Sequence, residues 1–316
     1  KTSYRETLLE LFFAISGFLK VADQYDNSYT TCYEKIDKNL KIKLFCIDPS
    51  GHLNQALKRC RAAIFFSATM TPITYFKTIL GCDNHADQLI LPSPFPPQNF
   101  GIFVSDTVST LYRHRHRTKS EVAKAILTFV KQHQGNYLMF FPSYEYMMMV
   151  YNLFQAECSQ IDTIVQRPGM SESERDAFLE RFAQENSELL VGFAVMGGIF
   201  GEGIDLVGER LSGAAIIGVG LPAISLENDL IREYFAQDLN AGFEFAYLYP
   251  GINRVLQAAG RVIRTEDDRG VVLLIDQRYA TARYRSLLPK HWRPIRSKNE
   301  HRLAEDLQMF WNQTVV

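Results

Sequence analysis

The sequence predicts an α/β fold in which a parallel sheet is covered by helices on both faces, forming a three-layer sandwich. Short runs rich in β-branched and aromatic residues recur along the 316-residue chain, and they are apolar almost throughout. Segments with helical spacing separate these runs. Strands that are buried on both faces have this near-continuous apolar character, so we expect the runs to form one parallel sheet.

Seven runs are the strand candidates. They are IKLFCI at 42–47, AAIFFS at 62–67, NYLMFF at 136–141, DTIV at 162–165, ELLVGFAV at 188–195, GAAIIGV at 213–219 and GVVLLI at 270–275.

Helical patterns lie between the strand candidates. EVAKAILTFVKQH at 121–133 places four apolar side chains along one face, Val122, Ile126, Phe129 and Val130. SESERDAFLERFA at 171–183 opens with a capping box from Ser171 to Glu174. After AAIFFS, we expect Thr71 as the N-cap and Pro72 as the first residue of another helix.

The composition is that of a globular protein without a global electrostatic preference. A hydrophobic content of 47% is enough for a core, and a net charge of -1 gives no overall attraction to nucleic acid. Lys and Arg gather in two segments, LYRHRHRTK at 111–119 and RYRSLLPKHWRPIRSK at 283–298. Taken alone, each is more typical of a solvated loop than of a binding surface, and we assign no single residue there.

Five cysteines, none in a C-x-x-C spacing, predict neither a disulfide framework nor a metal site. The chain has no apolar run long enough to span a bilayer and no signal-peptide pattern, which indicates the cytoplasm. Residues 4–22 have helical spacing from their first turn, and we expect them to end a segment that begins earlier in a longer protein.

Four segments beside the strand candidates carry residues suited to chemistry. They are SATMTP with Ser67 and Thr69, PSY with Ser143 and Tyr144, the glycine-rich GGIFGEGIDL at 197–206, and QAAGRVIRTEDDRG at 257–270. Loops at the carboxyl ends of parallel strands form the ligand sites of such sheets. We therefore expect all four segments at that edge.

Each segment also has a purely structural interpretation. Hydroxyl groups after a strand commonly cap the next helix, and glycines supply positive φ angles at sharp turns. Arg261 and Arg264 could form surface ion pairs with Glu266, Asp267 or Asp268, at roughly 0 to 1 kcal/mol each. These interpretations do not explain why the four segments follow one another in this order.

Together the segments resemble the second motor domain of superfamily two helicases, in the XPD/DinG-like branch. FFSATMTP resembles the motif that follows that branch's inserted module, FFPSY resembles motif four, GEGIDL motif five and QAAGRVIR motif six. The resemblance runs from about residue 42 to 279. It implies a RecA-like motor domain at 41–316 and makes residues 1–40 the tail of the inserted helical module.

The chain lacks two elements that a helicase motor needs. It contains no G-x-x-x-x-G-K-[ST] phosphate loop and no Asp-Glu pair after a strand. The resemblance implies that a first RecA-like domain of the same polypeptide, before residue 1, binds most of ATP and its Mg²⁺. We expect this chain alone to hold no cofactor and to be inactive.

The resemblance implies roles for the residues of motifs five and six. Arg261 and Arg264 would be arginine fingers for the γ-phosphate, an effect worth about 10³ to 10⁵ in rate, because guanidinium offers forked donors. Gln257 would contact the phosphates or the attacking water. The implied ATP-binding residues are Gly260, Glu202, Gly203 and Asp205.

A single strand of DNA is the implied second ligand. Ser143 and Tyr144 are expected to contact it, and Ser67 with Thr69 would add further contacts. Tyr144 fits the core of the domain equally well. The two basic segments become better candidates once phosphates must be held.

A dinucleotide-binding enzyme is a competing interpretation from another class. GAAIIGVGLPA places Gly218, Gly220 and Ala223 in the G-x-G-x-x-[GA] spacing, with Asp238 about 20 residues beyond. That acidic residue should end a second strand, but the spacing of residues 225–240 predicts a helix there. A third possibility is a catalytically silent nucleic-acid-binding module, for which an arginine pair aimed at a γ-phosphate has no use.

Overall fold

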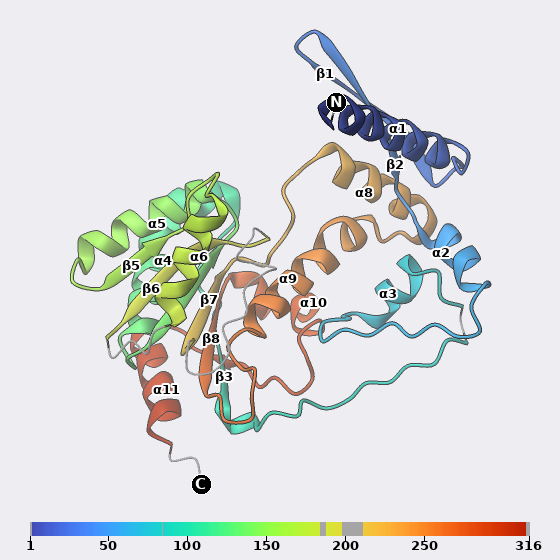
Figure 1. Cartoon of the computed structure of the whole chain (residues 1–316). Coiled ribbons are helices and arrows are strands. Elements are labelled where there is room, and N and C mark those ends of the chain that lie inside the picture. The colour runs from blue at the N-terminus through green and yellow to red at the C-terminus, as the bar shows by residue number, and fades with distance from the viewer. Residues whose placement is uncertain (1, 84, 184–187, 198–210, 314–316) are drawn as a thin grey trace. The chain divides into compact units, whose positions relative to one another are not determined.

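The structure is a computed structural model that describes residues 2–83, 85–183, 188–197 and 211–313. The chain divides into two compact units, one formed by residues 1–87 with 223–247 and the other by residues 88–222 with 248–316. Figure 1 shows the whole chain. The two units are described separately below.

The larger unit, residues 88–222 with 248–316, contains a seven-stranded sheet in the order β5-β6-β4-β7-β8-β3-β9, and every neighbouring pair is parallel. The strands are β3 (Phe100–Ser105), β4 (Asn136–Phe141), β5 (Asp162–Val165), β6 (Leu190–Val195), β7 (Gly213–Ile217), β8 (Gly270–Ile275) and β9 (Ile295–Arg296). All residues of β4, β7 and β8 are buried, as the apolar runs predicted.

Helices cover both faces of this sheet. One apolar cluster joins α4 (Arg115–Val130), α5 (Tyr144–Glu157) and α11 (Glu300–Asn312) to one face, and a second joins α6 (Glu172–Ala183) and α9 (Tyr249–Ala259) to the other. Successive strand residues alternate between the two clusters, because side chains alternate across a strand. The predicted α/β sandwich is confirmed, and it has the RecA-like fold.

Shorter elements complete the larger unit. They are η1 (Pro97–Asn99), η2 (Tyr112–His114), η4 (Gln277–Ala280) and α10 (Ala282–Arg285). The capping box that begins α6 is confirmed, since the N–H of Ser171 donates to Glu174 Oε2 at 2.7 Å and the N–H of Glu174 donates to Ser171 Oγ at 3.3 Å.

The smaller unit, residues 1–87 with 223–247, is mainly helical with one hairpin. It contains α1 (Thr2–Ala22), the antiparallel strands β1 (Tyr29–Ile36) and β2 (Asn39–Cys46), α2 (Ser50–Leu57), α3 (Ile73–Ile79) and α8 (Leu226–Leu239). A π-helical turn, η3 (Glu244–Leu248), leads into α9. The ring of Phe245 stacks on Phe235 at 4.2 Å and meets Tyr75 edge-on at 5.1 Å, which joins α3 and α8.

Two strand predictions need correction. IKLFCI at 42–47 forms most of β2, but that strand pairs with β1 in the hairpin rather than in the parallel sheet. AAIFFS at 62–67 forms no strand; Ile64 is 85% and Phe66 is 88% exposed, because no sheet edge in the described part of the chain pairs with it. Strands β1, β3 and β9 were missed.

The helix boundaries also differ from the expectation. α4 begins at Arg115, so the basic segment 111–119 forms η2 and the first turn of a helix instead of a loop. α3 begins at Ile73 with Pro72 as its N-cap, one residue later than predicted. None of the helices in the described ranges has the length and apolar character needed to cross a membrane.

Candidate functional site

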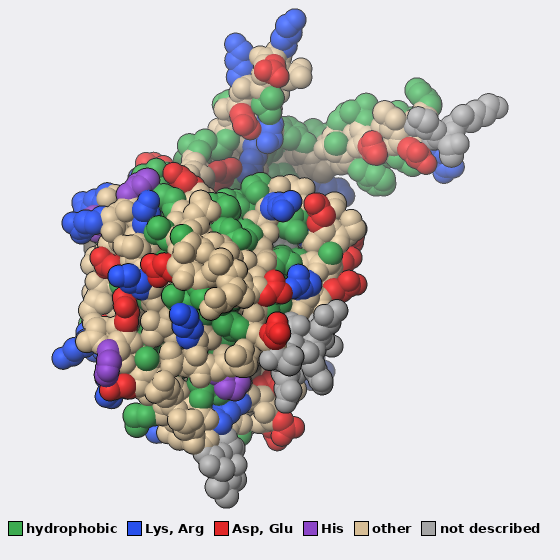
Figure 2. Space-filling view, turned by 90° about the vertical axis from the view of Figure 1, so that its left-hand side faces the viewer, with side chains coloured by type: hydrophobic (Ala, Val, Ile, Leu, Met, Phe, Trp, Pro, Cys, Tyr) green, Lys and Arg blue, Asp and Glu red, His purple; other side chains and the backbone are tan. Residues whose placement is uncertain are grey.

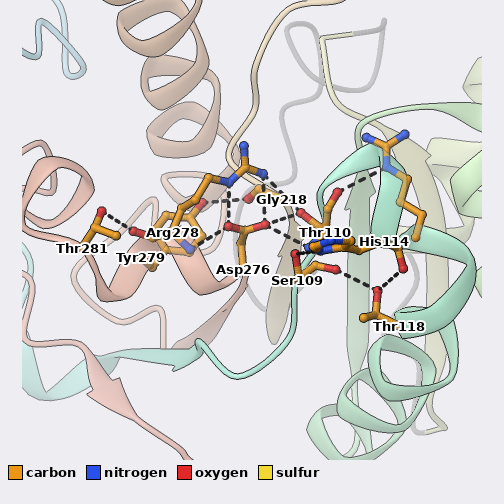
Figure 3. Close-up of polar contacts among 10 residues, drawn as sticks. Ser109, Thr110, His114, Thr118, Gly218, Asp276, Arg278, Tyr279 and Thr281 are labelled. Atoms are coloured by element: carbon orange, nitrogen blue, oxygen red, sulfur yellow. Dashed lines mark hydrogen bonds and ion pairs between the residues drawn. The ribbon is translucent and has the colours of Figure 1, made fainter.

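The carboxyl edge of the parallel sheet brings together polar residues that are far apart in sequence. Thr110 follows β3, Ser143 follows β4, Gln166 follows β5, Gly218 follows β7 and Asp276 follows β8. Since all the strands run in one direction, their ends meet at this edge. Part of the edge is shown in Figure 3.

Asp276 is the centre of the hydrogen-bond network in Figure 3. Its side chain is fully buried and accepts the backbone N–H of Thr110 at 3.2 Å and the hydroxyl of the same residue. It also accepts the backbone N–H of Arg278 at 2.7 Å. A buried carboxylate needs several hydrogen-bond donors, because burying a charge without partners costs free energy.

Arg278 neutralises the buried carboxylate. Its Nε lies 2.7 Å from Asp276 Oδ1, and its Nη2 lies 3.0 Å from Oδ2. Burial lowers the pKa of Arg278, but the hydrogen bonds and the charge of Asp276 outweigh it, so that the pKa is raised overall. The two residues therefore form a forked, charge-assisted pair.

Two further sets of hydrogen bonds connect neighbouring loops to this network. The buried Tyr279 donates its hydroxyl to the carbonyl of Gly218 at 2.9 Å, which joins the ends of β7 and β8. Thr118 donates to the carbonyl of Ser109 at 2.7 Å, and Ser109 Oγ lies 2.9 Å from His114 Nδ1. The loop after β3 is thereby fixed to the start of α4.

Arg115 lies at the same edge. Its Nε donates to the carbonyl of Thr110 at 3.3 Å, and its guanidinium carbon lies 4.8 Å from the ring centre of Tyr146 and 5.4 Å from that of Tyr112. Burial lowers the pKa of Arg115, although a guanidinium remains charged in proteins. Burial likewise raises the pKa of Tyr146 to about 12, so this ring stays neutral.

The residues predicted in motif four lie at this edge. Ser143 is the N-cap of α5, and its Oγ accepts the backbone N–H of Tyr146 at 3.3 Å. Tyr144 is half-buried, and its hydroxyl oxygen accepts Nε2 of Gln166 at 2.9 Å. Its ring is thus partly accessible to a ligand.

Ser67 and Thr69 belong to the smaller unit, where Ser67 is exposed and Thr69 is half-buried. The backbone N–H of Thr69 donates to Ser67 Oγ at 3.2 Å, and the two hydroxyl oxygens lie 3.4 Å apart. They form a local turn rather than the end of a strand.

Helix α9 carries motif six across the sheet. Near its start, a Cβ on Gly251 would lie 2.9 Å from the carbonyl oxygen of Val219, just after β7. Beyond its end, Val262 packs where a Cβ on Gly270, the first residue of β8, would be. The helix thus runs from the carboxyl edge to the amino edge.

The arginine pair therefore lies toward the edge opposite Asp276, and the expectation that all four segments meet at the carboxyl edge is wrong for motif six. The reason is that this motif precedes its strand instead of following it. Arg264 is exposed, whereas Arg261 is only 6% exposed. Asp268 Oδ2 accepts the backbone N–H of Arg264 at 2.6 Å and that of Thr265 at 2.8 Å.

Gln257, on α9, and Gly260, at the end of that helix, are both exposed. Glu202, Gly203 and Asp205 of motif five lie outside the described residues. Gly197, just before that motif, has a φ of 77°, and a Cβ on it would lie 3.3 Å from the guanidinium carbon of Arg254. Arg254 was not predicted, although it lies on the same helix three residues before Gln257.

Thr110, Arg115, Asp276 and Arg278 were also missed. A signal existed for Asp276, since an acidic residue directly follows the apolar run GVVLLI. No pattern marked Thr110, because it contacts Asp276 from 166 positions away.

The dinucleotide fingerprint has a structural explanation. Gly218 and Gly220 have φ angles of 93° and 68°, and Gly220 packs directly against the backbone of Gly251. The next helix begins only at Leu226, and Asp238 lies inside that helix as expected. The glycines therefore serve a turn and a close helix approach.

Comparisons with known proteins agree with this architecture. The family model for the helicase C-terminal domain matches residues 126–295, more than half of the chain. A probable ATP-dependent helicase of Methanocaldococcus jannaschii is 30% identical over 246 residues, covering 73% of this chain and 36% of the relative. The ATP-dependent DNA helicase CHL1 of Coccidioides immitis is 24% identical, and the match covers 92% of this chain and 38% of the relative.

Two more matches point to XPD. The XPD helicase subunit of general transcription and DNA repair factor IIH of Schizosaccharomyces pombe is 23% identical, covering 93% of this chain and 39% of the relative. An apo structure of XPD shares the fold with a TM-score of 0.65 at 20% identity, covering 94% of this chain and 59% of that structure. The chain spans less than two fifths of the length of these three curated relatives. The chain belongs to the helicase C-terminal domain family, in the XPD-like branch of superfamily two.

Proposed function

We propose that this chain is the second motor domain of an ATP-dependent DNA helicase and acts with a first RecA-like domain that supplies the phosphate loop. The observation that carries the proposal is the family match over residues 126–295, in a chain whose sequence contains no G-x-x-x-x-G-K-[ST] phosphate loop. The relatives are described as ATP-dependent helicases, and their greater length leaves room for such a domain.

The exposed run AAIFFS supports a partner domain. Ile64 and Phe66 present large apolar side chains to solvent in an unpaired segment. Exposed apolar backbone of this kind is a template for pairing with the edge of another sheet. A strand position in the first motor domain would bury both side chains and place Ser67 and Thr69 at the end of that strand.

The end of α9 has the donor chemistry that ATP with Mg²⁺ would need from this domain. Arg264 and Gln257 are exposed, and the carboxylate of Asp268 is directed to backbone N–H groups. ATP bound to the first domain would supply the phosphoryl group. Arg264 would then donate to its oxygens, while the buried Arg261 fits a role in holding the turn as well as one at the phosphate.

The carboxyl edge is proposed as part of the DNA track. The net charge of -1 gives no overall attraction to nucleic acid, and acidic and basic side chains are interspersed on the face drawn in Figure 2. Local groups would hold the phosphates, and the segment from Tyr112 to Lys119 offers them beside Ser143 and Tyr144. A role in DNA repair completes the proposal, in keeping with the name of the S. pombe relative. We also propose a cytoplasmic location.

Two measurements test the proposed function. The purified 316-residue chain should bind single-stranded DNA weakly and show negligible ATPase activity. The intact protein should separate the strands of 5′-tailed or 3′-tailed duplexes only when ATP is present. Substantial ATP turnover by the 316-residue chain would overturn the half-site argument, and an intact protein that binds DNA without hydrolysing ATP would instead be a silent binding module.

A further inference from the structure

A pocket opens beside motif four, between α5 and the loop that follows β5. Its volume is about 370 Å³, within the range of small-ligand sites. Tyr144, Met148 and Tyr151 line one side. Their spacing of four and three residues places all three on one face of α5.

The opposite side comes from residues 165–168. Val165 and Pro168 provide apolar surface, and Met148, which is 39% exposed, faces the same space. Pro168 and the aromatic rings are rigid, so the space between them is suited to a flat apolar group. Glu145 and Arg167, both exposed, add one acceptor and one donor group to the lining.

The ring of Tyr144 is fixed before any ligand arrives. Gln166 is 2% exposed and donates its Nε2 to the hydroxyl oxygen of Tyr144 at 2.9 Å. Its Oε1 accepts the N–H of Val195 at 2.8 Å, and its own N–H donates to the carbonyl of Phe193 at 2.8 Å. This buried amide thus anchors the ring to β6, which reduces the entropy lost on binding.

Tyr151 is fixed in a similar way. Its ring meets Phe193 edge-on at 5.1 Å, and its hydroxyl oxygen lies 3.3 Å from Thr163 Oγ1. Two aromatic side chains of the lining are therefore held in place.

Cationic groups lie on two sides of this part of α5. Arg167 is in the pocket lining, and Arg115 lies over the ring of Tyr146, two residues from Tyr144. A strand crossing here would have one cation in the pocket lining and a second cation near the same turn of α5. Sites for single-stranded nucleic acid commonly combine cations that contact the phosphate backbone with aromatic rings on which bases stack.

We propose that this pocket takes up a single nucleobase from the DNA strand. The inference rests on the proposed function, because it needs a strand at the carboxyl edge. The base lies between Tyr144 and Met148 on one side and Pro168 on the other, and its phosphates remain outside near Arg115 and Arg167.

The test measures binding of the 316-residue chain to a fluorescently labelled oligodeoxythymidine and to an abasic strand with the same number of phosphates. Tyr144→Ala should weaken binding of the thymidine strand roughly 5- to 150-fold, the range for loss of one stacked base. Met148→Ala should change it in the same direction by a smaller factor. Neither variant should alter binding of the abasic strand.

Asn152→Ala is the matched control, because Asn152 is exposed on the same helix and does not line the pocket. Circular dichroism shows whether Tyr144→Ala is folded. If it is not, Met148→Ala still tests the pocket, because Met148 is a surface residue. If Tyr144→Ala weakens binding of the thymidine strand and of the abasic strand equally, the pocket assignment is overturned. It is also overturned if the parent chain binds DNA and neither variant changes that binding. If the parent chain binds neither strand, the proposed DNA track fails and the pocket assignment fails with it.

Discussion

The guanidinium of Arg278 donates two hydrogen bonds, of 2.7 and 3.0 Å, to the carboxylate of Asp276, and this carboxylate is completely buried. The same carboxylate accepts the backbone and hydroxyl donors of Thr110. One residue after β8 therefore fixes the loop after β3, and that loop carries the start of α4. The pair thus links the end of β8 to the loop after β3 at the carboxyl edge.

Asp276→Asn should destabilise the larger unit. The change removes the charge that compensates Arg278 and leaves Thr110 with a weaker acceptor. We expect the free energy of unfolding to fall by about 3 to 4 kcal/mol, the lower part of the range of about 3 to 5 kcal/mol for breaking a buried pair. The lower part applies because the Arg278 side chain keeps 20% of its surface in water. Urea denaturation measures the change.

Asp162→Asn is the matched control for this prediction. Asp162 also pairs with an arginine, Arg181, but both side chains are about half exposed, at 53% and 43%. Loss of an exposed pair should cost about 0 to 1 kcal/mol. Equal effects of the two substitutions would contradict the role assigned to the Asp276 network.

Gly220→Ala should disrupt the approach of α9 to the end of β7. Gly220 has a φ of 68°, and a Cβ there would collide with the backbone carbonyl of Gly251. Gly169 has a similar φ of 72° but open space around it, so Gly169→Ala isolates the backbone term of about 1 to 2 kcal/mol. Gly220→Ala should cost roughly 1 to 3 kcal/mol more because of overpacking. Thermal denaturation of both variants would show whether the helix approach is as tight as the structure indicates.

The apolar runs predicted the centre of the sheet well, because β4, β7 and β8 are buried on both faces and need continuous apolar sequence. The same signal was misleading for AAIFFS, since an apolar run reveals the need for a partner but not where the partner lies. β9 has only two residues, too few for a periodic pattern. Motif four was placed correctly at the carboxyl edge, whereas the position of motif six depends on the direction of α9.

The Asp276 network could not have been predicted from sequence. Its members come from the ends of separate strands, and the order of those strands decides which ends are neighbours. β3 and β8 are adjacent although about 165 residues separate them, as the register pairing Ser105 with Ile275 shows. Local patterns contain no information on such a pairing.

Removing the charges of Arg113 and Arg117 together should weaken binding of single-stranded DNA. Both side chains are exposed, Arg113 in η2 just before α4 and Arg117 in the first turn of α4, where cations are unfavourable for the helix dipole. We therefore expect the Arg113→Ala/Arg117→Ala variant to fold normally. The slope of log K against log salt should fall by about 0.7 for each phosphate that the variant no longer neutralises. Fluorescence anisotropy across a salt series measures this slope.

Lys131→Ala is the control for that variant, because Lys131 is exposed just after the other end of the same helix. Its salt slope should match that of the parent chain. A slope that stays unchanged in the double variant would remove the start of α4 from the DNA track.

Arg264→Ala in the intact protein should abolish DNA-stimulated ATP hydrolysis, with a loss of about 10³-fold or more in kcat. The side chain is exposed, and the turn around it is held by Asp268 through backbone N–H groups that the substitution keeps. Folding and DNA binding should therefore remain normal, which circular dichroism and anisotropy can verify. Arg264→Lys retains the charge but not the forked donors, so it should recover only part of the rate. Arg181→Ala is the control, since Arg181 lies on α6 and its ion pair with Asp162 is about half exposed. A kcat for Arg264→Ala equal to that of the control would show that the exposed guanidinium at the end of α9 does not reach the transferred phosphate.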